Sequence, residues 1–145
     1  MKTIPKYLII LLLTFVFIGC STEIELKDYI NISAPFQLTI NHEDSISGLT
    51  SSKTIVLIEN SEKWKKLIEW VENNKKGWHY SPVSYIADIY VIQGDFKLLY
   101  LRNSSGVVIS FIDNQGNSRQ YEKTIIKGNL DFLTNIDSTG FKTYK

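Results

Sequence analysis

The chain of 145 residues contains a single cysteine, Cys20, and therefore cannot form an internal disulfide bond. Its folded part must be stabilised by packing and hydrogen bonding alone. Arginine is almost as scarce, because Arg102 and Arg119 are the only two among 16 basic residues. Two arginines cannot form a site in which several guanidinium groups bind phosphates or carboxylates in bidentate fashion.

An excess of charge of either sign is missing as well. The 16 basic and 15 acidic residues give a formal net charge of +1 at pH 7. Nucleic-acid-binding proteins carry strongly basic surfaces, so this balance gives no electrostatic case for such a partner. We therefore expect no nucleic-acid partner.

Motifs for catalysis and for cofactor binding are also missing. The sequence contains no Gly-x-Ser-x-Gly nucleophile turn and no Ser-x-x-Lys pair. It contains no phosphate-binding loop, no Gly-x-Gly-x-x-Gly and no His-Glu-x-x-His. We therefore expect no cofactor and assign no catalytic residue.

Metal ligands are sparse, because histidine occurs only at His42 and His79. His42 is followed by Glu43 and Asp44, but neighbouring side chains on an extended chain point to opposite sides. A zinc site usually needs three or four ligands that converge on one point. A solvated loop explains this cluster better, and we predict no metal site.

The sequence does contain a long apolar run near its start. Two lysines precede residues 8–18, in which Thr14 is the only polar residue, and the small Gly19 follows directly before Cys20. This layout is typical of an export signal. Eleven residues span about 16 Å as a helix, roughly half of the ~30 Å hydrocarbon core of a bilayer. A permanent transmembrane helix is therefore the weaker interpretation.

The four residues Phe17-Ile18-Gly19-Cys20 resemble the lipobox of bacterial lipoproteins. The resemblance implies that Cys20 is lipidated, becomes the first mature residue and anchors the protein to a membrane of the bacterial cell envelope. Lipidation also explains an unpaired cysteine in an exported protein. Ser21 in place of Asp implies sorting to the outer membrane, on its periplasmic face or at the surface, if the cell has two membranes. The alternative is that Cys20 is an ordinary small apolar residue and the signal is cleaved elsewhere.

Two strands and one helix are predicted in the first half of the mature chain. Apolar and polar residues alternate over 36–40, which favours a half-buried strand, and the apolar run 54–58 favours a strand covered on both faces. A helix is predicted over 62–75, where apolar residues recur at helical spacing. Asn60 or Ser61 can cap its start.

Four further strands are predicted as an antiparallel meander, since apolar stretches alternate with turns rich in Gly, Asn and Asp. They cover residues 85–93, 96–102, 107–112 and 118–126. Residues 130–136 have the spacing of a short amphipathic helix. The predicted fold is therefore α+β: one mainly antiparallel sheet, made of two N-terminal strands and the meander, packed by one long helix and a short C-terminal helix.

The chain is predicted to form a single domain, because 126 residues remain after the signal is removed. The predicted division is a signal peptide over residues 1–19, a lipid anchor and tether over 20–34, the α+β domain over 35–137 and a polar tail over 138–145. The alternative to the tether is a strand that starts at the alternating Ile24 and Leu26.

The most suggestive surface feature is the loop between the predicted helix and the meander. Trp78, His79 and Tyr80 lie in this loop and Tyr85 follows it. Such side chains are enriched where proteins bind partners or stack on sugars. Trp70, beside the apolar stripe of the helix, is a further candidate for binding. The alternative is that Trp78 and Tyr80 fold back and seal one end of the core.

Three functions remain open from the sequence. The favoured one is a non-catalytic lipoprotein that binds a protein partner in the envelope, as an inhibitor, an immunity-type protein or an assembly factor does. The second is a sugar- or cell-wall-binding module that uses Trp78, Tyr80 and Trp70. The third is a hydrolase with dispersed carboxylates, for instance Asp88 and Asp113. The absence of catalytic and cofactor motifs favours the first.

Overall fold

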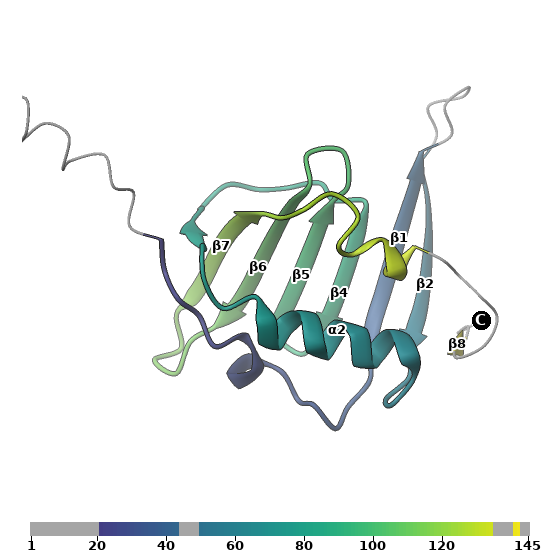
Figure 1. Cartoon of the computed structure of the whole chain (residues 1–145), viewed down its shortest axis with the longest axis horizontal. Helices are drawn as coiled ribbons and strands as arrows, with labels where there is room; N and C mark the ends of the chain where they lie inside the picture. Colours follow the sequence, from purple (N-terminus) through teal and green to yellow (C-terminus); the bar gives the residue numbers. More distant parts are fainter. Residues whose placement is uncertain (1–20, 44–49, 135–140, 143–145) are drawn as a thin grey trace, which may run out of the picture.

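The computed structural model describes residues 21–43, 50–134 and 141–142 (Figure 1). The predicted signal peptide, the lipobox and Cys20 lie outside these residues. Within the described ranges, no helix combines the length and the apolar character needed to cross a bilayer.

The described residues form one α-helix, α2 (Glu62–Asn73), and two short 3₁₀ helices, η2 (Leu26–Tyr29) and η3 (Asp131–Leu133). The strands are β1 (Phe36–Glu43), β2 (Thr50–Leu57), β3 (His79–Tyr80), β4 (Ile89–Gln93), β5 (Phe96–Leu101), β6 (Gly106–Ile112), β7 (Ser118–Thr124) and β8 (Phe141–Lys142). They pair into one antiparallel sheet in the order β3-β7-β6-β5-β4-β1-β2-β8.

The predicted combination of a mainly antiparallel sheet and one long helix is confirmed. Strands β4 to β7 form the predicted meander. Strand β1 pairs with β2 on one side and with β4 on the other, so it connects the N-terminal pair of strands to the meander. Leu38 of β1 pairs with Ile55 of β2 on one side and with Val91 of β4 on the other. Two distant parts of the chain therefore share one sheet.

Helix α2 lies across one face of this sheet (Figure 1). The hydroxyl oxygen of Ser61 accepts a hydrogen bond from the backbone N–H of Trp64 at 3.3 Å, which caps the first turn as predicted. At the other end, the side-chain amide of Asn74 donates to the carbonyl of Trp70 at 2.8 Å, and the helix ends at Asn73. The helix buries one apolar stripe, made of Trp64, Leu67, Trp70 and Val71.

The core lies between α2 and the facing side of the sheet. Leu38, Val91, Leu98 and Ile109 are consecutive cross-strand partners, and each is fully buried. Side chains alternate between the two faces of a strand, so this row defines the helix-facing side. Burial of such side chains contributes about 1.5–3 kcal/mol each.

The segment before β1 belongs to the domain, which corrects the predicted tether over residues 20–34. Ile24 and Leu26 are 6% and 1% exposed and lie in the core cluster. Tyr29 stacks on Phe111 with ring centroids 3.8 Å apart. The sequence showed only scattered apolar residues here, because their partners lie far along the chain.

Further elements differ from the sequence-based predictions. The run 54–58 is not covered on both faces, since Val56 is half-buried. Residues 85–88 precede β4 without joining it, and the predicted helix over 130–136 is only the 3₁₀ turn η3 over its described part. The short strands β3 and β8 were not predicted. β8 pairs with β2 within the predicted polar tail.

Candidate functional site

The side of the sheet that faces away from α2 is here called the open face. Its side chains alternate with the buried helix-facing row, and the strand register aligns them into two cross-strand rows. The first row is Thr54, Thr39, Tyr90, Leu99 and Val108. The second row is Val56, Gln37, Ile92, Lys97 and Ser110.

The open face is of mixed polarity. Tyr90, Ile92, Leu99 and Val56 are all half-buried, so apolar surface is left in contact with water on β5, β4 and β2. Hydroxyl groups lie among them: the side-chain oxygens of Thr39 and the facing Thr54 are 2.9 Å apart. A mixture of apolar and hydrogen-bonding groups is typical of surfaces that bind another protein.

Residues 81–88 cross the open face on their way from β3 to β4. The side-chain amide of Gln120 donates to the carbonyls of Ser81 and Val83 at 2.7 and 2.6 Å. The backbone N–H of Ala87 donates to the hydroxyl of Tyr90 at 3.0 Å. Val108 in the first row is 1% exposed and lines one pocket with Tyr85 of this segment. At the other end of the two rows, Thr39 of β1 and Val56 of β2 remain partly exposed.

Tyr85 fixes the middle of this crossing segment. Its hydroxyl donates a hydrogen bond to the carboxylate of Glu122 on β7, and the hydroxyl oxygen of Ser81 lies 2.5 Å away. Burial raises the pKa of the Tyr85 phenol, and the carboxylate of Glu122 raises it further. The phenol is therefore held neutral, in the form that donates to Glu122.

A pocket of about 250 Å³ lies where this segment meets the edge of the sheet. Tyr85, His79 and Glu122 line it, together with residues of β5 and β6. His79 faces Glu122 across the β3–β7 pair and is exposed. The structure thus brings together two of the predicted site residues, His79 and Tyr85.

Trp78 does not lie in this pocket. It is fully buried, and its indole N–H donates to the carbonyl of Asn74 at 2.7 Å. The ammonium nitrogen of Lys123 lies 5.5 Å from the centre of the Trp78 ring, and burial lowers the pKa of that ammonium. Trp78 therefore seals the core beyond the helix end and has no ring face exposed to a ligand.

Trp70 is buried beside Trp78, at 7% exposure, so neither tryptophan presents a ring to solvent. Tyr80 behaves differently, because 63% of its surface is exposed. Its ring packs edge-on against Tyr121 at a centroid distance of 6.0 Å. Of the predicted aromatic candidates, Tyr80 alone is more than half exposed.

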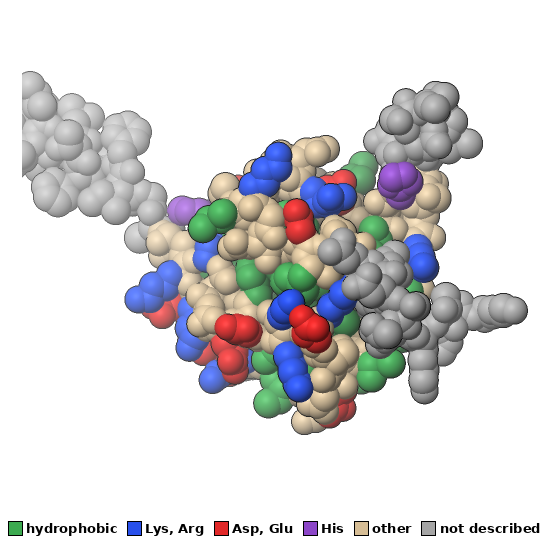
Figure 2. Space-filling model, turned by 45° about the vertical axis from the view of Figure 1, so that its right-hand side comes forward, with side chains coloured by type: hydrophobic (Ala, Val, Ile, Leu, Met, Phe, Trp, Pro, Cys, Tyr) green, Lys and Arg blue, Asp and Glu red, His purple; other side chains and the backbone are tan. Residues whose placement is uncertain are grey.

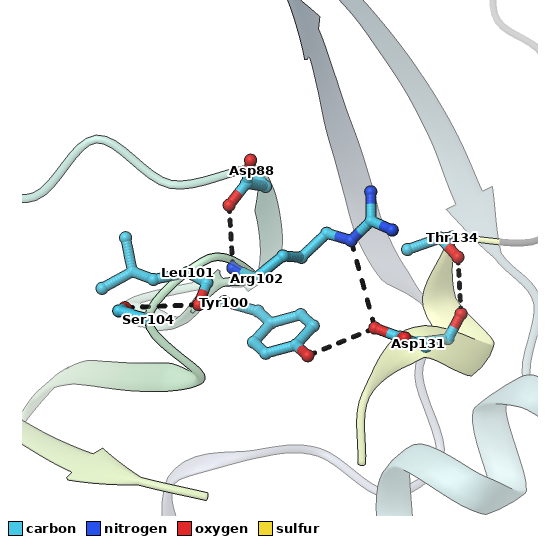
Figure 3. A network of polar contacts seen from close by, with 7 residues as sticks. All are labelled: Asp88, Tyr100, Leu101, Arg102, Ser104, Asp131 and Thr134. Carbon is cyan, nitrogen blue, oxygen red and sulfur yellow. Dashed lines mark hydrogen bonds and ion pairs between the residues drawn. The ribbon is translucent and has the colours of Figure 1, made fainter. Parts of the chain in front are cut away.

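A polar network lies at the end of the sheet where β5 turns into β6 (Figure 3). The carboxylate of Asp88 accepts from the backbone N–H of Arg102 at 2.8 Å. The hydroxyl of Tyr100 donates to the carboxylate of Asp131 at 3.2 Å, and the guanidinium of Arg102 lies 4.0 Å from that carboxylate. Burial raises the pKa of the Tyr100 phenol. The network joins the turn after β5 to the segment that carries η3.

The predicted carboxylate pair for hydrolysis does not form. Asp88 precedes β4 beside Tyr100, whereas Asp113 follows β6 at the opposite end of the sheet. Asp113 is bound by the guanidinium of Arg119 at 2.7 Å and by backbone N–H groups of its own turn. The carboxylate brought near Asp88 is Asp131, since both line one pocket of about 270 Å³. No local pattern predicts this proximity, because 43 positions separate Asp88 from Asp131.

The surface charges are interspersed, in agreement with the balanced composition. Basic and acidic side chains lie next to one another on the side of the molecule shown in Figure 2. Lys66 pairs with Glu62 at 2.6 Å, and Lys75 pairs with Glu25 at 2.7 Å. Among the described residues, no group of three or more His, Cys, Asp or Glu side chains could hold a metal ion.

Comparison with known proteins finds no matching family model, no matching curated protein and no matching solved structure.

Proposed function

We propose that this chain is a lipid-anchored protein of the bacterial cell envelope that binds a protein partner across its open sheet face. It acts without catalysis, as an inhibitor, an immunity-type protein or an assembly factor does. The membrane anchor is the lipid on Cys20. The observation that carries the binding proposal is the half-buried apolar surface of the open face, opposite α2.

The anchoring part of the proposal is supported by the sequence at the start of the chain. A basic start, an apolar run and the residues Phe17-Ile18-Gly19-Cys20 together have the layout of a lipoprotein signal. Two or more acyl chains on one cysteine give stable membrane attachment. The partner is therefore expected in the envelope.

The binding part is supported by the chemistry of the open face. Protein interfaces combine an apolar centre with a hydrogen-bonding rim. Here Tyr90, Ile92 and Leu99 supply the apolar centre, while Thr39 and Lys97 supply polar groups beside it. The strands hold these side chains in fixed register, so little conformational entropy is lost when a partner docks.

A groove on the other side of the molecule favours a second candidate, a sugar- or cell-wall-binding module. It has a volume of about 320 Å³ and lies between α2 and the segment that carries η3. Trp70 and Phe132 line it together with the amide side chains of Asn73 and Asn129. Amides and aromatic side chains are groups that bind sugars, but Trp70 is nearly buried, so a sugar would contact mainly its edge.

Site-specific photocrosslinking tests the protein-binding proposal. A photoreactive phenylalanine analogue replaces Leu99 on the open face, and Ile32 in a matched control; Ile32 is 54% exposed and precedes β1. After irradiation of intact cells, we expect a discrete crosslinked species from position 99 and none from position 32. Ile92→Lys should remove this species, because a second ammonium beside that of Lys97 cannot be buried unpaired in an apolar interface.

Equal crosslinking from both positions, or none from position 99, would rule out the open face as the binding site. Glycan binding that is lost in Asn73→Ala and Asn129→Ala would instead support the groove and the second candidate. A native protein whose N-terminal peptide carries no lipid mass would rule out the proposed anchor.

A further inference from the structure

The position of the N-terminal segment determines which edge of the domain lies nearest to the anchor. The backbone N–H of Thr22 donates to the carbonyl of Trp78 at 2.7 Å, and the N–H of Trp78 donates back at 3.3 Å. The N–H of Ile24 then donates to the carbonyl of Lys75 at 2.8 Å. The chain is thus attached to the domain from Thr22 onward.

Only a very short connection separates this attachment from the predicted lipid. Cys20 precedes Thr22 by two residues, and an extended chain spans at most about 3.6 Å per residue. Covalent geometry therefore limits the distance between the Cα atoms of Cys20 and Thr22 to roughly 7 Å. A flexible tether over 20–34 would let the domain rotate freely, but the burial of Ile24 and Leu26 excludes such a tether.

Two large apolar side chains are exposed directly beyond this attachment point. Tyr80 follows Trp78 by two residues and is 63% exposed, and Val83 is 54% exposed. Tyr80 packs against Tyr121, which belongs to the helix-facing row. The carbonyl of Val83 accepts from the side-chain amide of Gln120, which belongs to the open face. The β3 edge of the sheet is therefore flanked by the ring of Tyr80 on the helix-facing side and by the backbone of Val83 on the open side.

We propose that this corner, β3 with Tyr80 and Val83, rests against the lipid surface that holds the anchor. The proposal depends on lipidation of Cys20, as proposed above. Tyrosine is enriched at membrane–water interfaces, where its ring lies among the headgroups and its hydroxyl remains hydrated. Burial of exposed Tyr and Val side chains adds to the attachment that the acyl chains provide.

The charges near the corner indicate that the contact is apolar and not electrostatic. Lys75 is paired with Glu25, and Lys76 lies 3.7 Å from Glu23. Cations and anions are therefore balanced beside the attachment point. We expect the orientation to be the same on neutral and on anionic lipid.

This orientation leaves the binding surfaces accessible. β3 is one edge of the sheet, and β2 lies six strand positions away. At about 4.8 Å per strand, β2 is roughly 29 Å from β3. The sheet then stands on its β3 edge, and both the open face and the groove beside α2 remain in contact with the envelope solution.

Depth-dependent quenching tests the orientation. Cys20 is the only cysteine and its thiol is consumed by lipidation, so Tyr80→Cys, Val83→Cys and Ile32→Cys each give one thiol for an environment-sensitive fluorophore. Ile32 is the matched control, because it is exposed to the same 54% as Val83. The purified lipidated proteins are placed in phosphatidylcholine vesicles, with or without phosphatidylglycerol, that contain spin-labelled lipid.

We expect several-fold stronger quenching at positions 80 and 83 than at position 32, with and without phosphatidylglycerol. Equal quenching at all three positions, or none at 80 and 83, overturns the proposed orientation. Intact mass measured on the same samples reports lipidation. Loss of the lipid mass contradicts the anchor itself, whereas a lipidated protein without quenching at 80 and 83 contradicts the orientation alone.

Discussion

The indole of Trp78 meets that of Trp70 edge to face, with ring centroids 6.5 Å apart and planes at 81°. This pair joins the last turn of α2 to the chain that leads into β3. The indole N–H of Trp78 has a partner, the carbonyl of Asn74. The indole N–H of Trp70 is buried without a hydrogen-bond acceptor in the described part of the chain.

The two tryptophans should therefore respond differently to substitution. We expect Trp78→Ala to lower the free energy of unfolding by about 3–5 kcal/mol, since it leaves a large cavity and an unpaired carbonyl. Trp70→Phe removes an unpaired N–H and should change that free energy by less than about 1.5 kcal/mol. Denaturant titration measures both. An equal loss in the two variants would contradict this account of the pair.

The segment before β1 should be needed for stability. We expect Leu26→Ala to lower the free energy of unfolding by about 2–5 kcal/mol, because Leu26 is 1% exposed in the core. Ile32→Ala, in the same segment but 54% exposed, should change it by no more than about 0.5 kcal/mol. Removal of residues 21–34 should destabilise the domain more than either substitution. If a domain that starts at residue 35 is as stable as the wild type, residues 21–34 are a tether and not part of the domain.

Asp113 should contribute to stability in a pH-dependent way. Backbone N–H groups and Arg119 lower its pKa from 3.8 to about 2. Because the folded-state pKa is lowered, the contribution is present above about pH 4 and is lost as the pH falls toward 2. Asp113→Asn should be less stable at neutral pH and should lose less stability on acidification. Thermal unfolding across this range measures the effect, with Asp95→Asn in another turn as the control.

Tyr85 should hold the crossing segment 81–88 in place. We expect Tyr85→Phe to increase proteolytic cleavage within this segment at neutral pH, because the hydrogen bond to Glu122 is lost. Tyr80→Phe is the matched control, since its ring is 63% exposed. If both variants are cleaved at the wild-type rate, Tyr85 does not fix the segment.

The same phenol predicts a change at alkaline pH. Burial and Glu122 raise the pKa of Tyr85 above its ordinary value of 10. A raised folded-state pKa stabilises the fold below pH 10, and this contribution is lost as the pH rises through the folded-state value. Ultraviolet titration should show two late-ionising tyrosines, Tyr85 and Tyr100; Tyr85→Phe should remove one of them, and Tyr80→Phe should retain both.

Local patterns were sufficient to predict α2 and most of the meander. Ser61 caps the helix and the apolar residues recur at its period, so a 12-residue helix forms where the pattern predicted it. Gly94 and Gly116 adopt positive φ angles of 57° and 81° in the turns between strands. Both signals act within a few residues, and the sequence displays them directly.

Tertiary packing decided the remaining features, including the composition of the candidate site. Trp78 and Tyr80 are two residues apart and chemically similar, yet one is fully buried and the other 63% exposed. The sequence predicts Leu26 as part of a tether, and it pairs Asp88 with Asp113, whereas the fold places Leu26 in the core and Asp131 near Asp88. An apolar pattern shows that a face must be covered but not which distant segment covers it. The sequence by itself determined α2 and most of the meander, because capping, helical spacing and turn residues act locally. Long-range pairing and packing determined the short edge strands and which side chains remain at the surface.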